Sequence, residues 1–210
     1  MRELGAESEE DMFGKLLKII EHRHEVRMAL SSALRIADGD ENAMILGGLT
    51  DEEIAGLISW LPGRGTFVEF GTLFGLTAKA IAAAKPNLKI IAIDNFSWNP
   101  FGLPPALHEA FTRRILANEI SAGQIEVMNT TSEEFRADCK IVPDAVFFDA
   151  LHQYEPVKAE IEWAKSIGVK IITGHDYNNP SPIFGVTRAV DEIFGRENID
   201  VVGMCWRAVQ

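Results

Sequence analysis

Short apolar runs alternate with amphipathic stretches along the chain from Thr66 onward. Each run has the length of a strand and is apolar almost throughout, as expected of strands that are covered on both faces. Between the runs, apolar residues recur at the spacing of a helix. The pattern predicts strands over residues 67–70, 90–93, 125–128, 145–148 and 169–173, and helices over residues 76–84, 107–120, 154–166 and 186–194.

This alternation of strand and helix predicts a parallel sheet with right-handed crossovers and with helices on both faces. The fold class is therefore α/β, with a Rossmann-like, doubly wound and mostly parallel sheet. The tail of the chain, residues 199–209, also has a strand-like pattern. The sequence leaves open whether this tail is one long strand or a tight hairpin through Gly203 and Met204.

Residues 1–62 have a different, helical pattern. A first helical segment is expected to end at Asp38-Gly39-Asp40. A second is expected to begin after Thr50, which can cap it, and to end at Pro62-Gly63. We therefore expect an N-terminal helical extension over residues 1–62 and a Rossmann-like domain over residues 63–210. The apolar faces of the helices suit a cover over a binding site or, equally, a homo-oligomer contact.

The bulk composition is that of a globular protein of ordinary domain size. The chain has 210 residues, of which 47% are hydrophobic. No apolar run approaches the roughly 18 residues that span a membrane, and the polar start of the chain lacks a signal-peptide core. Cys139 and Cys205 lie far apart without metal-ligand spacing, which favours two reduced thiols. We expect a cytoplasmic protein with no membrane partner.

The acidic charge balance narrows the expected partners. The formal net charge is −11 at pH 7, and the isoelectric point is near 4.9. Such a field repels a phosphate backbone at long range, so we expect no nucleic acid partner. A small molecule is the better candidate for a substrate.

The loop after the first predicted strand has the glycines of a nucleotide-binding turn. Gly71 and Gly75 flank three residues before a helix begins, at the end of the sheet where open parallel sheets bind ligands. The spacing does not match the dinucleotide fingerprint or the phosphate loop, both of which have fixed glycine or lysine positions. A loop without basic residues that is entered through Glu69 suits a nucleotide that lacks phosphates and carries positive charge. S-adenosylmethionine is such a ligand.

The second predicted strand ends in an acidic residue, Asp94. It lies 23 positions after Gly71 (94 − 71), close to the roughly 20 positions that separate the glycines from the ribose-binding carboxylate in such units. A carboxylate there can accept hydrogen bonds from both ribose hydroxyls. The alternative is that the glycines only form a tight turn and that Asp94 only caps the next segment.

Two further motifs follow the fourth and fifth predicted strands. They are Asp149-Ala150-Leu151-His152-Gln153-Tyr154 and Gly174-His175-Asp176-Tyr177. Together with the glycine loop, they resemble the class I methyltransferases, and more narrowly a small-molecule branch with Asp-x-x-His-x-Tyr and Gly-His-Asp-Tyr motifs. Gly185-Val186 and Ala189-Val190-Asp191 resemble the helix that follows in that branch. The resemblance covers residues 66–209.

The resemblance implies S-adenosylmethionine as cofactor and assigns residues to its site. Glu69, Gly71 and Gly75 would shape the methionine pocket, and Asp94 would hold the ribose. We expect Thr72 and Asn95, which adjoin these residues, to line the same site.

The resemblance also points to a segment beside the adenine, after the third predicted strand. Thr131 and Ser132 would contact the adenine there. A polar turn that touches no ligand is the alternative for this segment.

The carboxylates that follow the fourth and fifth strands suggest a metal site. Asp149 and Asp176 would lie at adjacent strand ends, where they can share one divalent ion. Similar metal-dependent enzymes use a third oxygen ligand next to the second aspartate, but here that neighbour is His175, a nitrogen ligand that suits Mg²⁺ less well. Asn178 is an alternative source of oxygen. The predicted metal ligands are Asp149, Asp176 and His175, and dependence on Mg²⁺ is left open.

His152 is the candidate general base, with Asp149 as the second predicted catalytic residue. Methyl transfer requires the acceptor to lose its proton, and the ordinary pKa of histidine suits that task. The alternative is that His152 only holds its loop through a carboxylate.

The residues and the resemblance together favour O-methylation of a small molecule with S-adenosylmethionine as donor. One alternative is a non-catalytic module that binds S-adenosylmethionine, which has no need of Asp149, His152 and Asp176. The other is an NAD-dependent oxidoreductase on a related fold, which the glycine spacing disfavours.

Overall fold

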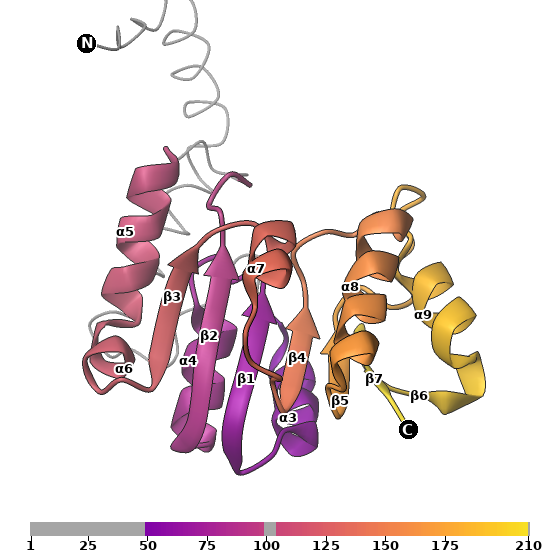
Figure 1. Cartoon of the computed structure of the whole chain (residues 1–210), viewed down its shortest axis with the longest axis horizontal. Coiled ribbons are helices and arrows are strands. Elements are labelled where there is room, and N and C mark those ends of the chain that lie inside the picture. The colour runs from indigo at the N-terminus through magenta and orange to yellow at the C-terminus, as the bar shows by residue number, and fades with distance from the viewer. Residues whose placement is uncertain (1–48, 99–103, 210) are drawn as a thin grey trace, which may run out of the picture.

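The computed structural model describes residues 49–98 and 104–209. Within them lies a seven-stranded sheet with the order β3-β2-β1-β4-β5-β7-β6 (Figure 1). The first five strands along the chain are parallel, and β7 runs antiparallel to both of its neighbours. This confirms the predicted α/β, doubly wound fold. The strands are β1 (Arg64–Phe70), β2 (Asn87–Asp94), β3 (Ile125–Asn129), β4 (Ala145–Phe148), β5 (Ile171–Gly174), β6 (Ile199–Val202) and β7 (Cys205–Ala208).

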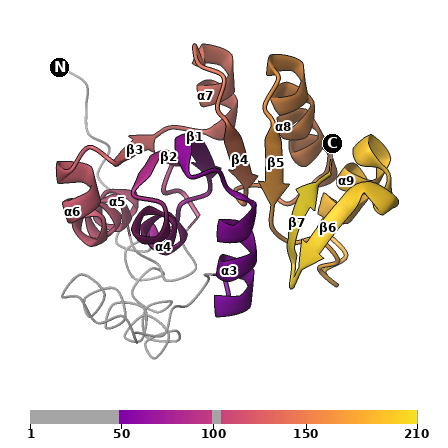
Figure 2. The same ribbon diagram turned by 90° about the horizontal axis from the view of Figure 1, so that it is seen from below.

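Helices cover both faces of the sheet, as Figure 2 shows from below. Successive residues of β1 point to opposite faces, so Phe67 belongs to one hydrophobic cluster and Val68 to the other. The Phe67 cluster includes buried side chains of α3 (Asp51–Trp60), α4 (Leu76–Ala84) and α5 (Pro105–Ile115). The Val68 cluster includes side chains of α7 (Ser132–Asp138), α8 (Tyr154–Ile167) and α9 (Val186–Phe194).

Helix ends follow local signals in the sequence. Thr50 caps α3 as predicted, and the Glu53 carboxylate accepts a hydrogen bond from the Thr50 amide, which completes a capping box. The helix predicted over residues 107–120 is two helices, because the chain turns at Leu116 between α5 and α6 (Ala117–Ser121). Helix α7 was not predicted, although Thr131 and Glu134 form a second capping box at its start.

The tail of the chain is a hairpin rather than one long strand. Gly203 has a φ of 59°, and it turns β6 back into β7. Strand β7 inserts between β5 and β6, with Gly174 opposite Trp206. The hairpin therefore brings the turn at residues 203–204 to the end of β5, where the Gly-His-Asp-Tyr motif begins.

The predicted N-terminal extension is described only in part. The helical segment that ends at Asp38-Gly39-Asp40 lies outside the described residues, as does any oligomer contact that it makes. Leu57 and Leu61 of the described part pack into the Phe67 cluster. The boundary at residue 62 stays a prediction. No described helix is both long and apolar enough to cross a membrane.

Candidate functional site

The candidate site lies where the order of the strands reverses. β1 is paired with β2 on one side and with β4 on the other, and β5 follows β4. The loops after these four parallel strands all leave from the carboxyl ends of the strands. Open α/β sheets bind their ligands at these ends.

Gly71 is the contact between the loop after β1 and the loop after β4. Its φ is 88°, and its amide donates to the Ile93 carbonyl at 2.9 Å. A Cβ at this position would lie 2.2 Å from the backbone oxygen of Asp149. The two loops therefore touch through their backbones, and only glycine allows this approach.

Asp94 ties the loops after β1 and β2 together. Its Oδ2 accepts from the Leu73 amide at 2.8 Å, and its Oδ1 accepts from the Phe96 amide at 2.7 Å. Helix α5 supports the same loop, because the Thr112 hydroxyl donates to the Leu73 carbonyl at 2.6 Å. Asn95 is exposed, and its side-chain oxygen accepts from the Ser97 amide within its own turn. The predicted ribose carboxylate is thus held in a fixed orientation before any ligand arrives.

Glu69 is a buried carboxyl group at the end of β1. Burial raises its pKa to about 8, and the nearby charges of Asp149 and Asp94 add to the rise against a hydrogen bond from Thr72. Its Oε2 has no hydrogen-bond partner among the described residues. Glu69 is therefore largely neutral at pH 7, with an acceptor atom to offer to a cationic ligand.

The predicted adenine contacts lie at the start of α7. The Thr131 hydroxyl accepts from the Glu134 amide at 3.1 Å, as the cap of the helix. The Ser132 hydroxyl donates to Glu160, a fully buried residue of α8. Burial raises the pKa of Glu160 to about 7. Contact of Thr131 or Ser132 with a ligand stays a prediction.

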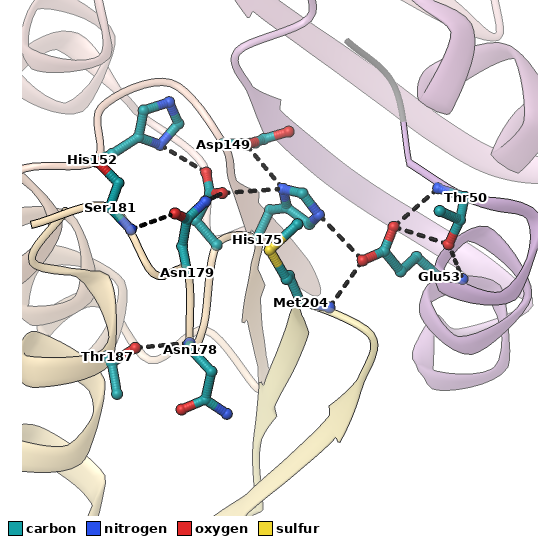
Figure 3. A network of polar contacts seen from close by, with 11 residues as sticks. Thr50, Glu53, Asp149, His152, His175, Asn178, Asn179, Ser181, Thr187 and Met204 are labelled. Carbon is teal, nitrogen blue, oxygen red and sulfur yellow. Dashed lines mark hydrogen bonds and ion pairs between the residues drawn. The ribbon is translucent and has the colours of Figure 1, made fainter.

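Two histidines and two aspartates form a polar cluster at the ends of β4 and β5 (Figure 3). The Nδ1 of His152 lies 3.0 Å from Oδ2 of Asp176. The Nδ1 of His175 lies 3.6 Å from Oδ1 of Asp149 and 3.8 Å from Oδ1 of Asp176. The structure thus brings together the four residues of the two motifs that the sequence singled out.

The chain after β5 is bent sharply to form this cluster. Asp176 and Asn178 have φ values of 60° and 62°, which are uncommon for residues other than glycine. The side-chain amide of Asn179 donates to Oδ1 of Asp176 at 2.6 Å, and the His175 amide donates to the Phe148 carbonyl at 3.0 Å. Such strained positions concentrate at functional sites.

The charges of the cluster shift one another's pKa values. Burial alone would lower the pKa of His175, but its hydrogen bonds to the carboxylates of Asp149 and Asp176 outweigh burial and raise the pKa to about 10. Burial likewise opposes the rise in the pKa of His152, which its contact with Asp176 brings about. The pKa of Asp176 is lowered by both histidines against burial, whereas burial raises the pKa of Asp149.

The cluster has the donor atoms of a cation site. One ligand atom each from Asp149, His175 and Asp176 can be chosen so that all three lie within 4.8 Å of one another. The side chain of Asn178, the alternative oxygen ligand, points away from the three (Figure 3). The set is therefore one imidazole nitrogen and two carboxylate oxygens.

The sequence analysis missed one residue of this network, Glu53. Its Oε1 accepts from the Met204 amide at 2.8 Å and lies 3.4 Å from Nε2 of His175. Glu53 belongs to α3, 122 positions before His175. The local pattern identifies it only as a capping-box residue. Its reach to the site depends on how α3 packs on the sheet.

Solved structures of methyltransferases have the same fold. An O-methyltransferase from Bacillus cereus in complex with S-adenosylhomocysteine is 16% identical, with 87% of this chain and 90% of that chain covered and a TM-score of 0.58. The O-methyltransferase TomG of Streptomyces achromogenes, in complex with S-adenosylmethionine, is 17% identical. The match covers 87% of this chain and 89% of that chain, with a TM-score of 0.57.

The likeness extends to methyltransferases of other kinds. A precorrin-6y C5,15-methyltransferase from Geobacter metallireducens is 19% identical over 78% of this chain and 79% of that chain, with a TM-score of 0.55. No family model matches the sequence, and no curated protein matches it either. The chain therefore has the fold of these methyltransferases.

Proposed function

We propose that this protein transfers a methyl group from S-adenosylmethionine to a hydroxyl oxygen of a small molecule. The observation that carries the proposal is the backbone contact between Gly71 and Asp149. It joins a loop suited to the donor to a cluster suited to proton removal, so that both act on one bound pair of substrates. The shared fold with S-adenosylmethionine-dependent enzymes supports the same conclusion.

The residues at the β1 and β2 ends fit the donor. Asp94 is oriented by two backbone amides, and each of its oxygens retains a lone pair for a ribose hydroxyl. The unpartnered oxygen of Glu69 suits the positive charge of the ligand. Gly71 leaves room at the point where the backbone approaches most closely.

His152 is suited to take the proton of the acceptor. In the reaction, the acceptor oxygen forms a bond to the methyl carbon, and the carbon–sulfur bond breaks. The sulfur keeps the electron pair, which gives S-adenosylhomocysteine. Because Nδ1 of His152 contacts Asp176, its Nε2 accepts the hydroxyl proton, and Asp176 stabilises the resulting imidazolium.

The nitrogen and oxygen donors of Asp149, His175 and Asp176 fit a divalent cation. When bound, such an ion would lower the pKa of the acceptor hydroxyl and orient it. Asp94 and Glu69 would still bind the donor, and His152 would still accept the proton. The net charge of −11 favours a small molecule over a nucleic acid as the acceptor.

Ligand binding to the purified protein tests this proposal. We expect S-adenosylhomocysteine to raise the thermal unfolding midpoint and NAD to leave it unchanged. Stabilisation by NAD alone would instead support an oxidoreductase and overturn the proposal. Methyl transfer to a panel of small hydroxylated acceptors then separates an enzyme from a module that only binds the donor.

The variant Asp94→Ala links this binding to the site. We expect it to weaken S-adenosylhomocysteine binding about tenfold or more, since each lost hydrogen bond to a charged group is worth about 1.5–3 kcal/mol. Asp144→Ala is a matched control, because Asp144 also holds a backbone amide, that of Thr66, at 2.9 Å at the opposite end of β1. Equal losses of affinity in both variants would show that the effect comes from the fold.

A further inference from the structure

Glu53 is a buried carboxylate whose two oxygens are both fixed by the chain. Oε2 accepts from the Thr50 amide at 2.8 Å and from the Thr50 hydroxyl at 2.9 Å. Oε1 accepts from the Met204 amide at 2.8 Å. The side chain is only 5% exposed. Three hydrogen bonds therefore hold the carboxylate in place independently of His175.

The hairpin turn is shaped to fit against this carboxylate. A Cβ at Gly203 would lie 2.5 Å from Oε1 of Glu53, and Gly203 has a left-handed φ of 59°. The Met204 carbonyl accepts from the Tyr177 amide at 3.0 Å, which ties the same turn to the chain after the Gly-His-Asp motif. The turn thus links Glu53 to the segment that carries His175.

The His175 ring lies between Glu53 and Asp149 (Figure 3). Its Nε2 is 3.4 Å from Oε1 of Glu53, whereas its Nδ1 faces Asp149 and Asp176 at 3.6 and 3.8 Å. A carboxylate on one ring nitrogen makes that nitrogen the hydrogen donor. Nδ1 faces Asp149 and Asp176 and holds a proton in the metal-free protein. It can exchange that proton for a metal ion, which then binds to its lone pair.

We propose that Glu53 is a positioning residue that holds Nδ1 of His175 toward Asp149 and Asp176, and that this site selects a divalent transition metal ion over Mg²⁺. The inference rests on the proposed function, because it concerns the cation that would activate the acceptor. Mg²⁺ strongly favours oxygen ligands, whereas imidazole is a good ligand for transition metals. An oriented nitrogen in place of a third oxygen therefore shifts the preference of the site.

Binding of Mn²⁺ to the metal-free full-length protein, measured by electron paramagnetic resonance, tests the proposal. We expect Glu53→Gln to weaken Mn²⁺ binding about 10- to 100-fold, the range found when carboxylate partners of metal-bound histidines are changed. Glu52→Gln is the matched control, because Glu52 is the exposed neighbour on the same helical turn. Thr50→Ala removes only one of the three hydrogen bonds to the Glu53 carboxylate, so it should weaken Mn²⁺ binding less than Glu53→Gln does.

A double-mutant cycle with His175→Asn separates positioning from folding. We expect Glu53→Gln to have no further effect on Mn²⁺ affinity once His175 is absent. The spin echo of bound Mn²⁺ should contain modulation from an imidazole nitrogen, and His175→Asn should remove it. That variant should also raise the affinity for Mg²⁺ relative to that for Mn²⁺, because it replaces a nitrogen ligand with an oxygen ligand.

Three results would overturn the proposal. They are equal losses of Mn²⁺ affinity in Glu53→Gln and Glu52→Gln, an unchanged effect of Glu53→Gln in the His175→Asn background, and Mg²⁺ binding as tight as that of Mn²⁺. Titration of the same samples with S-adenosylhomocysteine keeps the two proposals apart. Donor binding without Mn²⁺ binding overturns only this inference, whereas absence of donor binding overturns the proposed function.

Discussion

The two halves of the candidate site hold their polar groups in different ways. At the β1 and β2 ends, backbone amides fix the carboxylate of Asp94. At the β4 and β5 ends, imidazoles and carboxylates contact one another, as His152 and His175 do with Asp176. The carboxylate of Asp94 is therefore held by the path of the chain, whereas the cluster of the second half is held by side chains that contact one another. This difference suits a rigid donor site next to a site that moves a proton.

Loss of the candidate base should have the largest effect. We expect His152→Asn to lower the rate of methyl transfer about 100-fold or more, the usual contribution of a general base. The affinity for S-adenosylhomocysteine should stay the same, because the proposed donor contacts lie in the other half of the site. Single-turnover kinetics and calorimetry measure the two quantities. A rate loss below about tenfold would support the alternative that His152 only holds its loop.

Gly71→Ala should disturb both halves, since Gly71 is where they touch. The new methyl group would meet the Asp149 carbonyl at 2.2 Å in a left-handed backbone conformation. We expect the free energy of unfolding to fall by about 3 kcal/mol. Urea unfolding measures the change. Gly123→Ala is the control, because Gly123 has a φ of 69° but nothing within 4 Å of its Cβ position, and its loss should be about 1 kcal/mol.

The pH dependence of stability should depend on the histidine half. The pKa of His175 rises from its ordinary value to about 10 on folding, so the folded state binds more protons than the unfolded state up to that pH. Its stabilising contribution is complete below about pH 6.5 and is lost as the pH rises toward 10. With a metal chelator present, we expect the wild type to lose about 2 kcal/mol more than His175→Asn between pH 8 and 10. Parallel curves for the two proteins would contradict this prediction.

Donor affinity should depend on pH through Glu69. Its pKa of about 8 keeps the carboxyl group protonated at neutral pH, and a cationic ligand favours the ionised form. Affinity for S-adenosylmethionine should therefore rise about tenfold between pH 6 and pH 8, with release of a proton. Calorimetry in buffers of different ionisation enthalpy detects that proton. Glu69→Gln should flatten the profile, and an unchanged profile in this variant would assign the effect to the ligand.

Thr131→Ala should have the smallest effect, and it tests a predicted adenine contact. The hydroxyl of Thr131 caps α7, so its loss should lower the free energy of unfolding by about 1 kcal/mol. We expect donor affinity to change less than about twofold, since the side chain is already engaged in the cap. Thermal unfolding and calorimetry measure the two effects. A loss of affinity tenfold or greater would instead support direct contact with the adenine.

The sequence was sufficient to predict features that depend on neighbouring residues. Apolar runs identified the five parallel strands, because strands buried on both faces must be apolar. The spacing from Gly71 to Asp94 likewise reflects one strand-loop-helix unit. The short helix α7 was missed, since seven residues carry little periodicity, although its capping box was visible in the sequence.

Features that depend on tertiary packing could not be predicted. The hairpin at Gly203 was one of two open alternatives, because only pairing with β5 distinguishes it from a single strand. Glu53 contacts His175 only because α3 packs beside the end of β5. The residues next to Glu53 in the sequence carry no information about this contact.

The hydrogen bond from Met204 to Glu53 joins residues that are 151 positions apart. A ribosome therefore completes the five parallel strands before it adds the turn that fixes this carboxylate. During synthesis, Glu53 and His175 are therefore both present before the Met204 amide that helps to fix the Glu53 carboxylate. A chain truncated before Gly203 would lack β7, whose Trp206 is buried in the Val68 cluster, and would leave Glu53 without its hydrogen bond from Met204.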